Sequence, residues 1–255
     1  MGTSSIYNGK NDRNPLLPDD YEDNQSENSI QNGLIKWETV KSNMSKFIKS
    51  GGNRGSTKHI TKQYIKAAGG SKRMASQSTS GIRTGGSLGA LFNGLRTEGY
   101  AKTFSNLGIE FVGKSVQEIF SHLVDMLAAG SNTKEDIAAK EATKEALSKV
   151  YGYVENNNMN LECLDKMSPE MMNEALCEYI SSYIWALMMK DLESRFEMYI
   201  DDPKQSLSFE QEFKDYISST VRVEFDTKGD IVNQDVKSSL SELYGRCLEV
   251  LEGTI

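Results

Sequence analysis

Residues 115–127, SVQEIFSHLVDML, decide the fold class of this chain. Apolar residues recur there every three or four positions, a spacing that places their side chains on one face of an α-helix. These residues are Val116, Ile119, Phe120, Leu123, Val124 and Leu127. Ser115 followed by Glu118 predicts a capping box at the start of the helix, and Gly130 predicts its end. The stretch therefore predicts an amphipathic helix with one buried face.

Similar helical patterns follow toward the C-terminus. Thr133 and Asp136 repeat the capping spacing ahead of a second apolar stripe. Ser-Pro-Glu at 168–170 combines a capping hydroxyl, a proline suited to the first turn and an acid near the positive end of the helix dipole. We expect the helix that it opens to run to about Ile200, just before Asp-Asp-Pro at 201–203.

The last part of the chain predicts two more helices. Ser208 with Gln211 predicts the start of the first of them. VRVEF (221–225) alternates between apolar and polar residues, which fits either a short strand or the end of that helix. A final apolar stripe at helical spacing runs from Val236 to Leu251.

Before residue 115, three shorter apolar stripes are punctuated by glycines. The first two stop at Gly51-Gly52 and Gly69-Gly70, which suits helix C-caps because glycine enters the left-handed region without strain. The third lies in TGGSLGALFNGL (84–95). A phosphate-binding loop would need Lys-Ser/Thr after its last glycine, whereas Leu95 and Arg96 follow here. We therefore interpret these glycines as helix joints.

These patterns predict an all-α protein, a multi-helix globular body with a flexible N-terminal tail. Residues 1–33 are rich in Asn, Asp, Ser, Gly and Pro, too polar to offset the entropy of ordering, and are expected to be disordered. Residues 34–110 are expected to form a basic, glycine-punctuated helical segment. Residues 111–255 are expected to form an acidic helical domain.

The net charge of −7 conceals a basic segment at residues 36–102, which holds 13 Lys and Arg but two Glu. Such a segment can bind nucleic acid, dock on an acidic protein surface or serve solubility alone. The candidate anion or nucleic-acid contacts are Lys58, Lys62, Lys66, Lys72 and Arg73. GGNRG (51–55) resembles the GxxG clamp of some RNA-binding modules, but the strands of those modules are missing, which favours an ordinary turn.

No sequence motif indicates an enzyme. The chain contains no zinc-protease motif, and its two histidines, His59 and His122, have no nucleophile pattern near them. Three widely spaced cysteines favour reduced thiols in the cytoplasm over a disulfide framework or a metal site. The longest apolar run, YIWALMM (183–189), is far too short to span a membrane. We therefore expect a cytoplasmic protein without catalytic residues, metal or membrane contact.

The N-terminal stretch MGTSSIYNGK has no helical pattern. If Met1 is the initiator residue, its removal would leave Gly2 with a free amine. Myristoylation of that glycine needs Ser or Thr at position six, where this chain has Ile6. NPLLPDDY (14–21) holds two leucines between prolines, a patch that suits either docking on a partner or a plain linker.

Taken together, these features resemble the QatB family of Qat antiphage systems. The resemblance rests on the MGTSS start, PLLP at 15–18, the basic helix led by Trp37, and GGSKRM at 69–74. Asp19-Asp20 after PLLP and the Asn-rich tail depart from the family pattern.

The resemblance implies a role and partners. The partners are a QueC-like enzyme, an ATPase and a TatD-like nuclease. Gly2 would be the acceptor of a covalent deazaguanine adduct, with no cofactor held by the chain itself. Thr3, Ser4 and Ser5 would be the tail presented to the QueC-like enzyme, and Pro15, Leu16, Leu17 and Pro18 would dock on it. The alternative is a nucleic-acid-binding or scaffolding adaptor that acts through residues 36–102.

Overall fold

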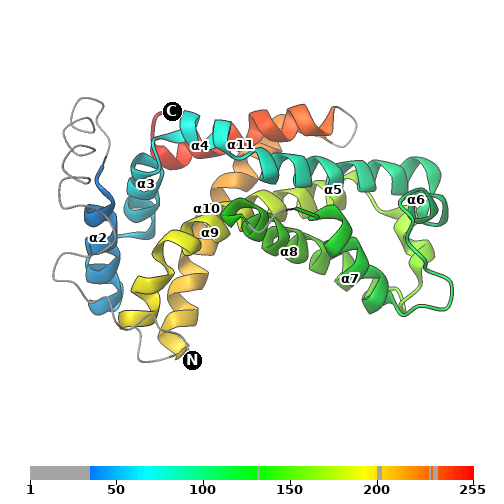
Figure 1. Ribbon diagram of the computed structural model, residues 1–255, viewed down its shortest axis with the longest axis horizontal. Helices are drawn as coiled ribbons and strands as arrows, with labels where there is room; N and C mark the ends of the chain where they lie inside the picture. Colours follow the sequence, from blue (N-terminus) through cyan, green and yellow to red (C-terminus); the bar gives the residue numbers. More distant parts are fainter. Residues whose placement is uncertain (1–34, 131–132, 200–202, 230, 232–234) are drawn as a thin grey trace.

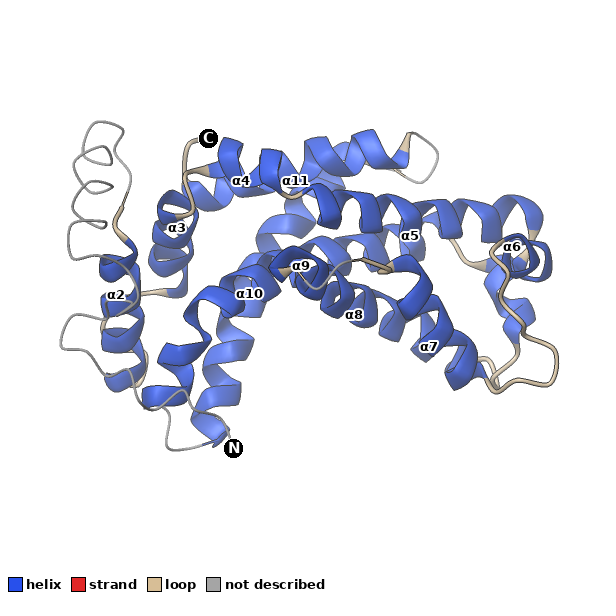
Figure 2. Ribbon diagram, in the orientation of Figure 1, coloured by secondary structure: helices blue, strands red, loops and turns tan. Residues whose placement is uncertain are grey.

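The computed structural model of this chain describes residues 35–130, 133–199, 203–229, 231 and 235–255. Every regular element in these ranges is a helix, and none of these residues lies in a strand (Figure 2). The all-α fold class predicted from the sequence is therefore confirmed for the described part of the chain. The predicted tail at 1–33 lies outside the described residues.

The described residues form ten α-helices and one 3-10 helix. In chain order these are α2 (Trp37–Lys49), α3 (Thr57–Ala67), α4 (Ser71–Gln77), α5 (Thr79–Glu98), α6 (Tyr100–Asn106), α7 (Val116–Leu127), α8 (Lys134–Asn156), η3 (Leu161–Lys166), α9 (Pro169–Tyr199), α10 (Pro203–Lys228) and α11 (Val236–Glu252).

The helices build an elongated, arched body around α9 (Figure 1). Helices α8 and α10 pack along α9, and α5 and α11 pack against each other above it. Helices α2 and α3 lie at one end of the body, and α6 and α7 lie at the other. The long helix predicted to start at Ser-Pro-Glu and end near Ile200 is confirmed as α9.

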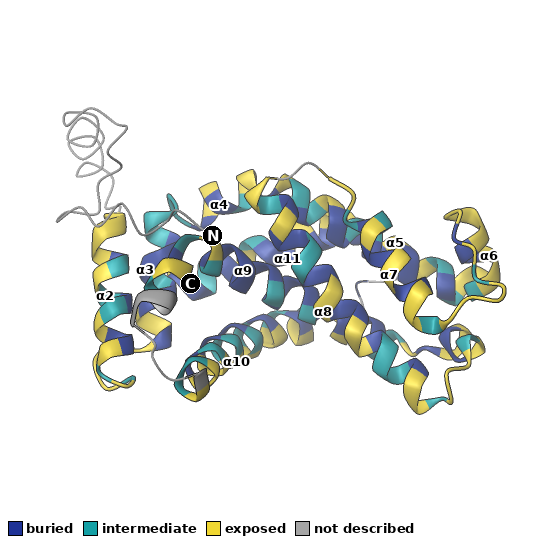
Figure 3. Ribbon diagram, turned by 60° about the horizontal axis from the view of Figure 1, so that its bottom comes forward, coloured by how far each residue is buried: buried dark blue, intermediate teal, exposed yellow. Residues whose placement is uncertain are grey.

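The centre of α9 is buried on all sides, as the dark blue ribbon of Figure 3 shows. Tyr183, Ile184, Trp185, Ala186, Leu187 and Met188 are each no more than 7% exposed. A helix that is apolar all round has to lie inside the molecule, because no face of it can be given to water. This helix therefore organises a core to which both halves of the chain contribute.

The helix ends follow the predicted local chemistry. The Ser115–Glu118 and Thr133–Asp136 capping boxes are both present at the starts of α7 and α8. The glycine pairs 51–52 and 69–70 follow α2 and α3, and all four glycines have positive φ angles, between 63° and 101°. Only glycine adopts these angles at little cost, so these pairs end the two helices as predicted.

One prediction near the C-terminus is wrong, because α10 begins at Pro203 rather than at Ser208. Of the two alternatives left open for VRVEF (221–225), the helical one is confirmed, since these residues belong to α10. Val221 and Phe225 lie one helical turn apart and are both buried, whereas Val223 between them is 61% exposed. The alternation at 221–225 therefore reflects one buried face of a long helix, and not a sheet.

The interpretation of the glycines at 84–95 as joints is also wrong, because they lie inside α5. A Cβ on Gly85 would lie 2.7 Å from Tyr179 of α9, and one on Gly94 would lie 2.9 Å from Thr103 of α6. These glycines let neighbouring helices approach the backbone of α5, so their role is packing rather than chain reversal.

The basic segment does not stand apart from the rest of the fold. Helices α3, α4 and α5 contact α11, and α2 contacts α9. The three cysteines predicted to be reduced are free and buried. The division of the chain at residue 110 stays a prediction from composition, since both sides of it enter one hydrophobic core.

Candidate functional site

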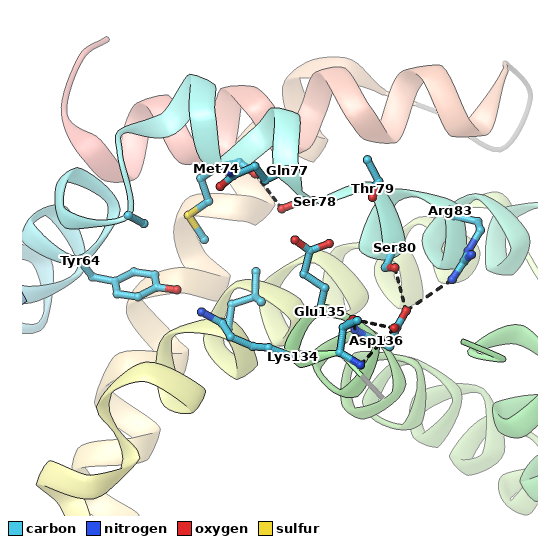
Figure 4. Close-up of a pocket in the computed structure, with 13 residues that line it drawn as sticks. Tyr64, Met74, Gln77, Ser78, Thr79, Ser80, Arg83, Lys134, Glu135 and Asp136 are labelled. Atoms are coloured by element: carbon cyan, nitrogen blue, oxygen red, sulfur yellow. Dashed lines mark hydrogen bonds and ion pairs between the residues drawn. The ribbon is translucent and has the colours of Figure 1, made fainter. Parts of the chain in front are cut away.

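A pocket of about 480 Å³ opens between the junction of α4 with α5 and the first turn of α8 (Figure 4). Tyr64 of α3, Ala68 at the end of the same helix and Leu187 of α9 complete its lining. Five helices therefore build it, from residues that lie up to 123 positions apart in the chain. Pockets of this size that gather a few polar groups are where proteins usually bind small ligands.

The α4–α5 junction is fixed by a buried serine. The Ser78 hydroxyl donates a hydrogen bond to the carbonyl of Met74 at 2.9 Å and lies 2.9 Å from the Tyr244 hydroxyl of α11. One turn later, the carbonyl of Gly81 accepts a hydrogen bond from the Tyr179 hydroxyl at 2.7 Å. These contacts hold the start of α5 against α9 and α11, and so hold one wall of the pocket.

Asp136 anchors the opposite wall. Its carboxylate accepts hydrogen bonds from the Thr133 hydroxyl at 2.6 Å and from the Ser80 hydroxyl at 2.7 Å. Arg83 of α5 lies 3.5 Å from the same carboxylate. The hydrogen bonds from Thr133 and Ser80, with the charge of Arg83, hold the pKa of Asp136 below its usual value. The capping box of α8 therefore also ties α8 to α5.

Asp191 of α9 lies behind the other side of the pocket. It accepts a hydrogen bond from the Tyr64 hydroxyl at 3.2 Å and forms an ion pair with Lys134. Burial, and then the charge of Asp191, raise the pKa of Tyr64, which is therefore a neutral hydrogen-bond donor. This contact connects α3, α8 and α9.

Glu135 lies between these two groups and extends from α8 toward the α4–α5 junction (Figure 4). Burial raises the pKa of this carboxyl, although the backbone N–H of Ser80 and the charge of Lys134 favour its ionised form. Among the described residues, no ion pair with Glu135 is present. The pocket therefore holds one partly buried carboxyl group without a cationic partner.

The five basic residues proposed from the sequence lie outside this pocket. Lys58, Lys62 and Lys66 share one face of α3, since they are four residues apart. Lys62 is half-buried, and its Nζ would lie 2.9 Å from a Cβ on Gly253, at the C-terminal end of α11. A cation there neutralises the negative end of a helix dipole, so Lys62 has a structural role in addition to any binding role.

Lys72 and Arg73 are exposed on α4, apart from the α3 row. The Arg73 side chain folds back over Gly69, where a Cβ would lie 2.4 Å from its Cδ. The structure therefore brings together three of the five predicted residues as a row and places the other two on a separate short helix.

A smaller hollow of about 260 Å³ lies beside the turn GGNRG. Lys46 of α2, Arg54 of the turn and His59 of α3 line it, and all three are exposed. The backbone N–H of Arg54 donates to the Ser50 hydroxyl at 2.8 Å, so the stretch is a turn between two helices, as favoured from the sequence. His122 is exposed on α7, away from both hollows.

The residues predicted to serve the N-terminal role are not placed by the structure. Gly2, Thr3, Ser4 and Ser5 lie outside the described residues, and so do Pro15, Leu16, Leu17 and Pro18. Within the described part of the chain, His, Cys, Asp and Glu gather nowhere in a group that could hold a metal ion. No helix in that part is long and apolar enough to cross a membrane.

The sequence did not single out Tyr64, Ser80, Arg83, Glu135 or Asp191. The capping box at Thr133 and Asp136 was the one local indication, because it located the start of α8 beside the pocket. Nothing local reveals that this helix start faces Ser80, 56 residues away from Asp136.

Comparisons with known proteins place the chain in a family. A family model described as Qat anti-phage system associated protein QatB matches residues 69–251. No curated protein and no solved structure matches the chain. The matched range covers most of the sequence and contains α4 to α10, including most of the lining of the larger pocket. The chain therefore belongs to the QatB family of the Qat anti-phage system.

Proposed function

We propose that this chain is a non-catalytic subunit of a Qat defence complex, which binds a QueC-like enzyme and presents Gly2 for conjugation to a deazaguanine. Membership of the QatB family is the observation that carries the proposal, because it assigns the chain to the anti-phage system. The partner and the acceptor residue follow from the resemblance of its sequence to the family, and the cytoplasmic site of action follows from its three widely spaced cysteines.

The chemistry of a terminal glycine supports this choice of acceptor. An α-amine has a pKa of about 7.7–8.0, so an appreciable fraction is neutral and nucleophilic near neutral pH, whereas the amine of lysine is almost wholly protonated. The amine nitrogen would attack a carboxylate that the partner has activated with ATP. A C–N bond forms, the activating group leaves with its electron pair, and the nitrogen loses a proton. Glycine adds no side chain to obstruct this approach.

Mass spectrometry of the protein tests this proposal directly. The chain is co-expressed with an active QueC-like enzyme, with an inactive one, or alone, and a peptide map then identifies the N-terminal residue. We expect loss of Met1 and an adduct on Gly2 with the active enzyme only. Gly2→Pro should block the adduct because its ring amine is crowded and its φ angle is fixed. An unmodified Gly2 in a defence-active complex would refute the proposal.

The row of lysines on α3 favours a second candidate function, an adaptor that binds nucleic acid through the basic segment. Lys58, Lys62 and Lys66 share a helix face, and the hollow lined by Lys46 and Arg54 lies next to it. Phosphate contacts of this kind weaken steeply as salt increases. A triple change of the α3 lysines to Gln should reduce binding to all sequences alike and flatten the salt dependence. Absence of binding at low salt would exclude this function.

A further inference from the structure

Around the larger pocket, the acidic side chains outnumber the basic ones by one when each basic side chain is paired with its nearest carboxylate. Arg83 lies beside Asp136, and Lys134 pairs with Asp191. Both cations are therefore engaged with other carboxylates of the site, which leaves Glu135 as the remaining anionic group.

Partial burial of the Glu135 carboxylate is energetically unfavourable. It is half-buried, and removal from water is the largest influence on its pKa. The backbone N–H of Ser80 and the charge of Lys134 favour the ionised carboxylate but do not offset its loss of water. A charge-assisted hydrogen bond to a bound cation would compensate the remainder. Glu135 lines the pocket and extends from α8 toward the α4–α5 junction (Figure 4).

The rest of the lining suits a small organic molecule with an apolar body. Met74 of α4 and Leu187 of α9 contribute apolar surface, while Thr79 and Ser80 contribute hydroxyl groups. Met74 and Leu187 are buried, so the apolar part of the lining belongs to the packed core. A volume of about 480 Å³ is within the range of sites that bind small molecules.

We propose that this pocket binds a small organic cation, with an amidinium or ammonium group on the Glu135 carboxylate and an apolar body against Met74 and Leu187. An amidinium matches a carboxylate with two parallel N–H donors, which gives direction as well as charge. This site is separate from the acceptor role proposed for Gly2, and neither proposal depends on the other.

Three probes of nearly equal shape test the proposal on the full-length protein. Benzamidine is cationic, benzamide is neutral and benzoate is anionic. Binding is measured for each by isothermal titration calorimetry and by ligand-observed NMR. We expect benzamidine to bind at least about tenfold more tightly than benzamide, which is the size of one charge-assisted hydrogen bond, and benzoate to bind least.

Variants then test whether the preference for benzamidine over benzamide depends on Glu135. Glu135→Gln keeps the size of the side chain and should abolish the preference for benzamidine over benzamide, whereas Glu135→Asp keeps the charge and should retain part of it. Glu145→Gln is the matched control, because Glu145 is exposed on the same helix outside the pocket. Circular dichroism checks that each variant is folded.

Three outcomes would overturn the proposal. Benzamidine and benzamide could bind equally, which would show that charge does not select the ligand. Alternatively, the preference for benzamidine could survive in folded Glu135→Gln, which would place the cation elsewhere. Failure of all three probes to bind at millimolar concentration would also count against a site for organic cations.

Discussion

Gly89 of α5 lies so close to Val236 of α11 that a Cβ on the glycine would be 2.0 Å from Val236 Cγ1. No side chain fits this gap unless the two helices move apart. The same helix presents Gly81 to Tyr183, where a Cβ would lie 2.2 Å from the ring. The glycines of α5 thus set the distances between α5, α9 and α11, and with them the wall of the pocket that contains Ser78 and Ser80.

Gly89→Ala should lower the free energy of unfolding by about 1–3 kcal/mol, the usual cost of overpacking a core. Gly152→Ala is the matched control, because Gly152 lies inside α8 with open space around its Cβ position. Alanine is favoured over glycine in a helix, so this control should gain about 0.5–1 kcal/mol. Urea unfolding of both variants measures the difference. Equal effects of the two changes would contradict the packing role of Gly89.

Removal of the side-chain hydroxyl should affect stability differently at Tyr179 and at Tyr183, although both residues are buried on α9. The Tyr179 hydroxyl donates to the Gly81 carbonyl at 2.7 Å, whereas the Tyr183 hydroxyl has no hydrogen-bond partner. Tyr179→Phe should therefore cost about 1 kcal/mol of stability, because a buried hydrogen bond is lost. Tyr183→Phe should cost no stability and should raise it by up to about 1 kcal/mol, since it removes an unpaired buried hydroxyl whose burial is unfavourable. Thermal unfolding monitored by circular dichroism ranks the two, and the reverse order would be a clear failure.

The buried thiols should resist alkylation. Burial raises the pKa of the Cys177 thiol to about 11 and also raises the pKa of Cys163 and Cys247. Because the thiolate is the reactive form, iodoacetamide at about pH 8 should label the folded protein slowly and all three cysteines rapidly in urea. Mass spectrometry counts the added groups. Rapid labelling of Cys177 under native conditions would show that its environment opens.

The same thiols predict a loss of stability at alkaline pH. A group whose pKa is raised in the folded state contributes its full stability below its unfolded pKa, about 8.5 for cysteine, and loses it as pH rises toward the folded value. For Cys177 this interval ends at about pH 11. Cys177→Ala should therefore show a smaller decrease in unfolding free energy between about pH 8 and about pH 10 than the unaltered chain. If Cys177→Ala lost as much unfolding free energy over this pH interval as the unaltered chain, groups other than the Cys177 thiol would cause the loss.

Asp136 should cause a loss of stability at acid pH, because its pKa is lowered in the folded state rather than raised. Hydrogen bonds from Thr133 and Ser80 lower its pKa, so it contributes stability above its unfolded pKa and loses it as pH falls through that value. Asp136→Asn should flatten the decrease in thermal stability between about pH 5 and about pH 3. Glu145→Gln, on an exposed position of the same helix, serves as the control and should leave the decrease unchanged.

Local sequence determined the elements that depend on neighbours along the chain. The period of apolar residues predicted α7, because the face of a helix is fixed by residues three and four apart. Ser-Pro-Glu at 168–170 predicted the start of α9. The capping residues Ser115 and Thr133 marked helix starts, and the glycine pairs after α2 and α3 marked helix ends, since each acts on backbone groups within one turn. Family membership was likewise readable from the sequence.

The tertiary structure alone decided what depends on partners far along the chain. Gly85 and Gly89 read as joints because glycine usually ends helices, but the approach of Tyr179 and Val236 makes them contact points inside one. The sequence left VRVEF (221–225) open between a strand and a helix, and the structure decided it, because Val221 and Phe225 are buried together on the inner face of α10. Nothing in the local sequence distinguishes Glu135 from the other acidic residues of α8. Its burial, and the engagement of Lys134 with Asp191, arise only when α3, α5, α8 and α9 are packed together, because desolvation is a property of the assembled surroundings and not of the residue itself.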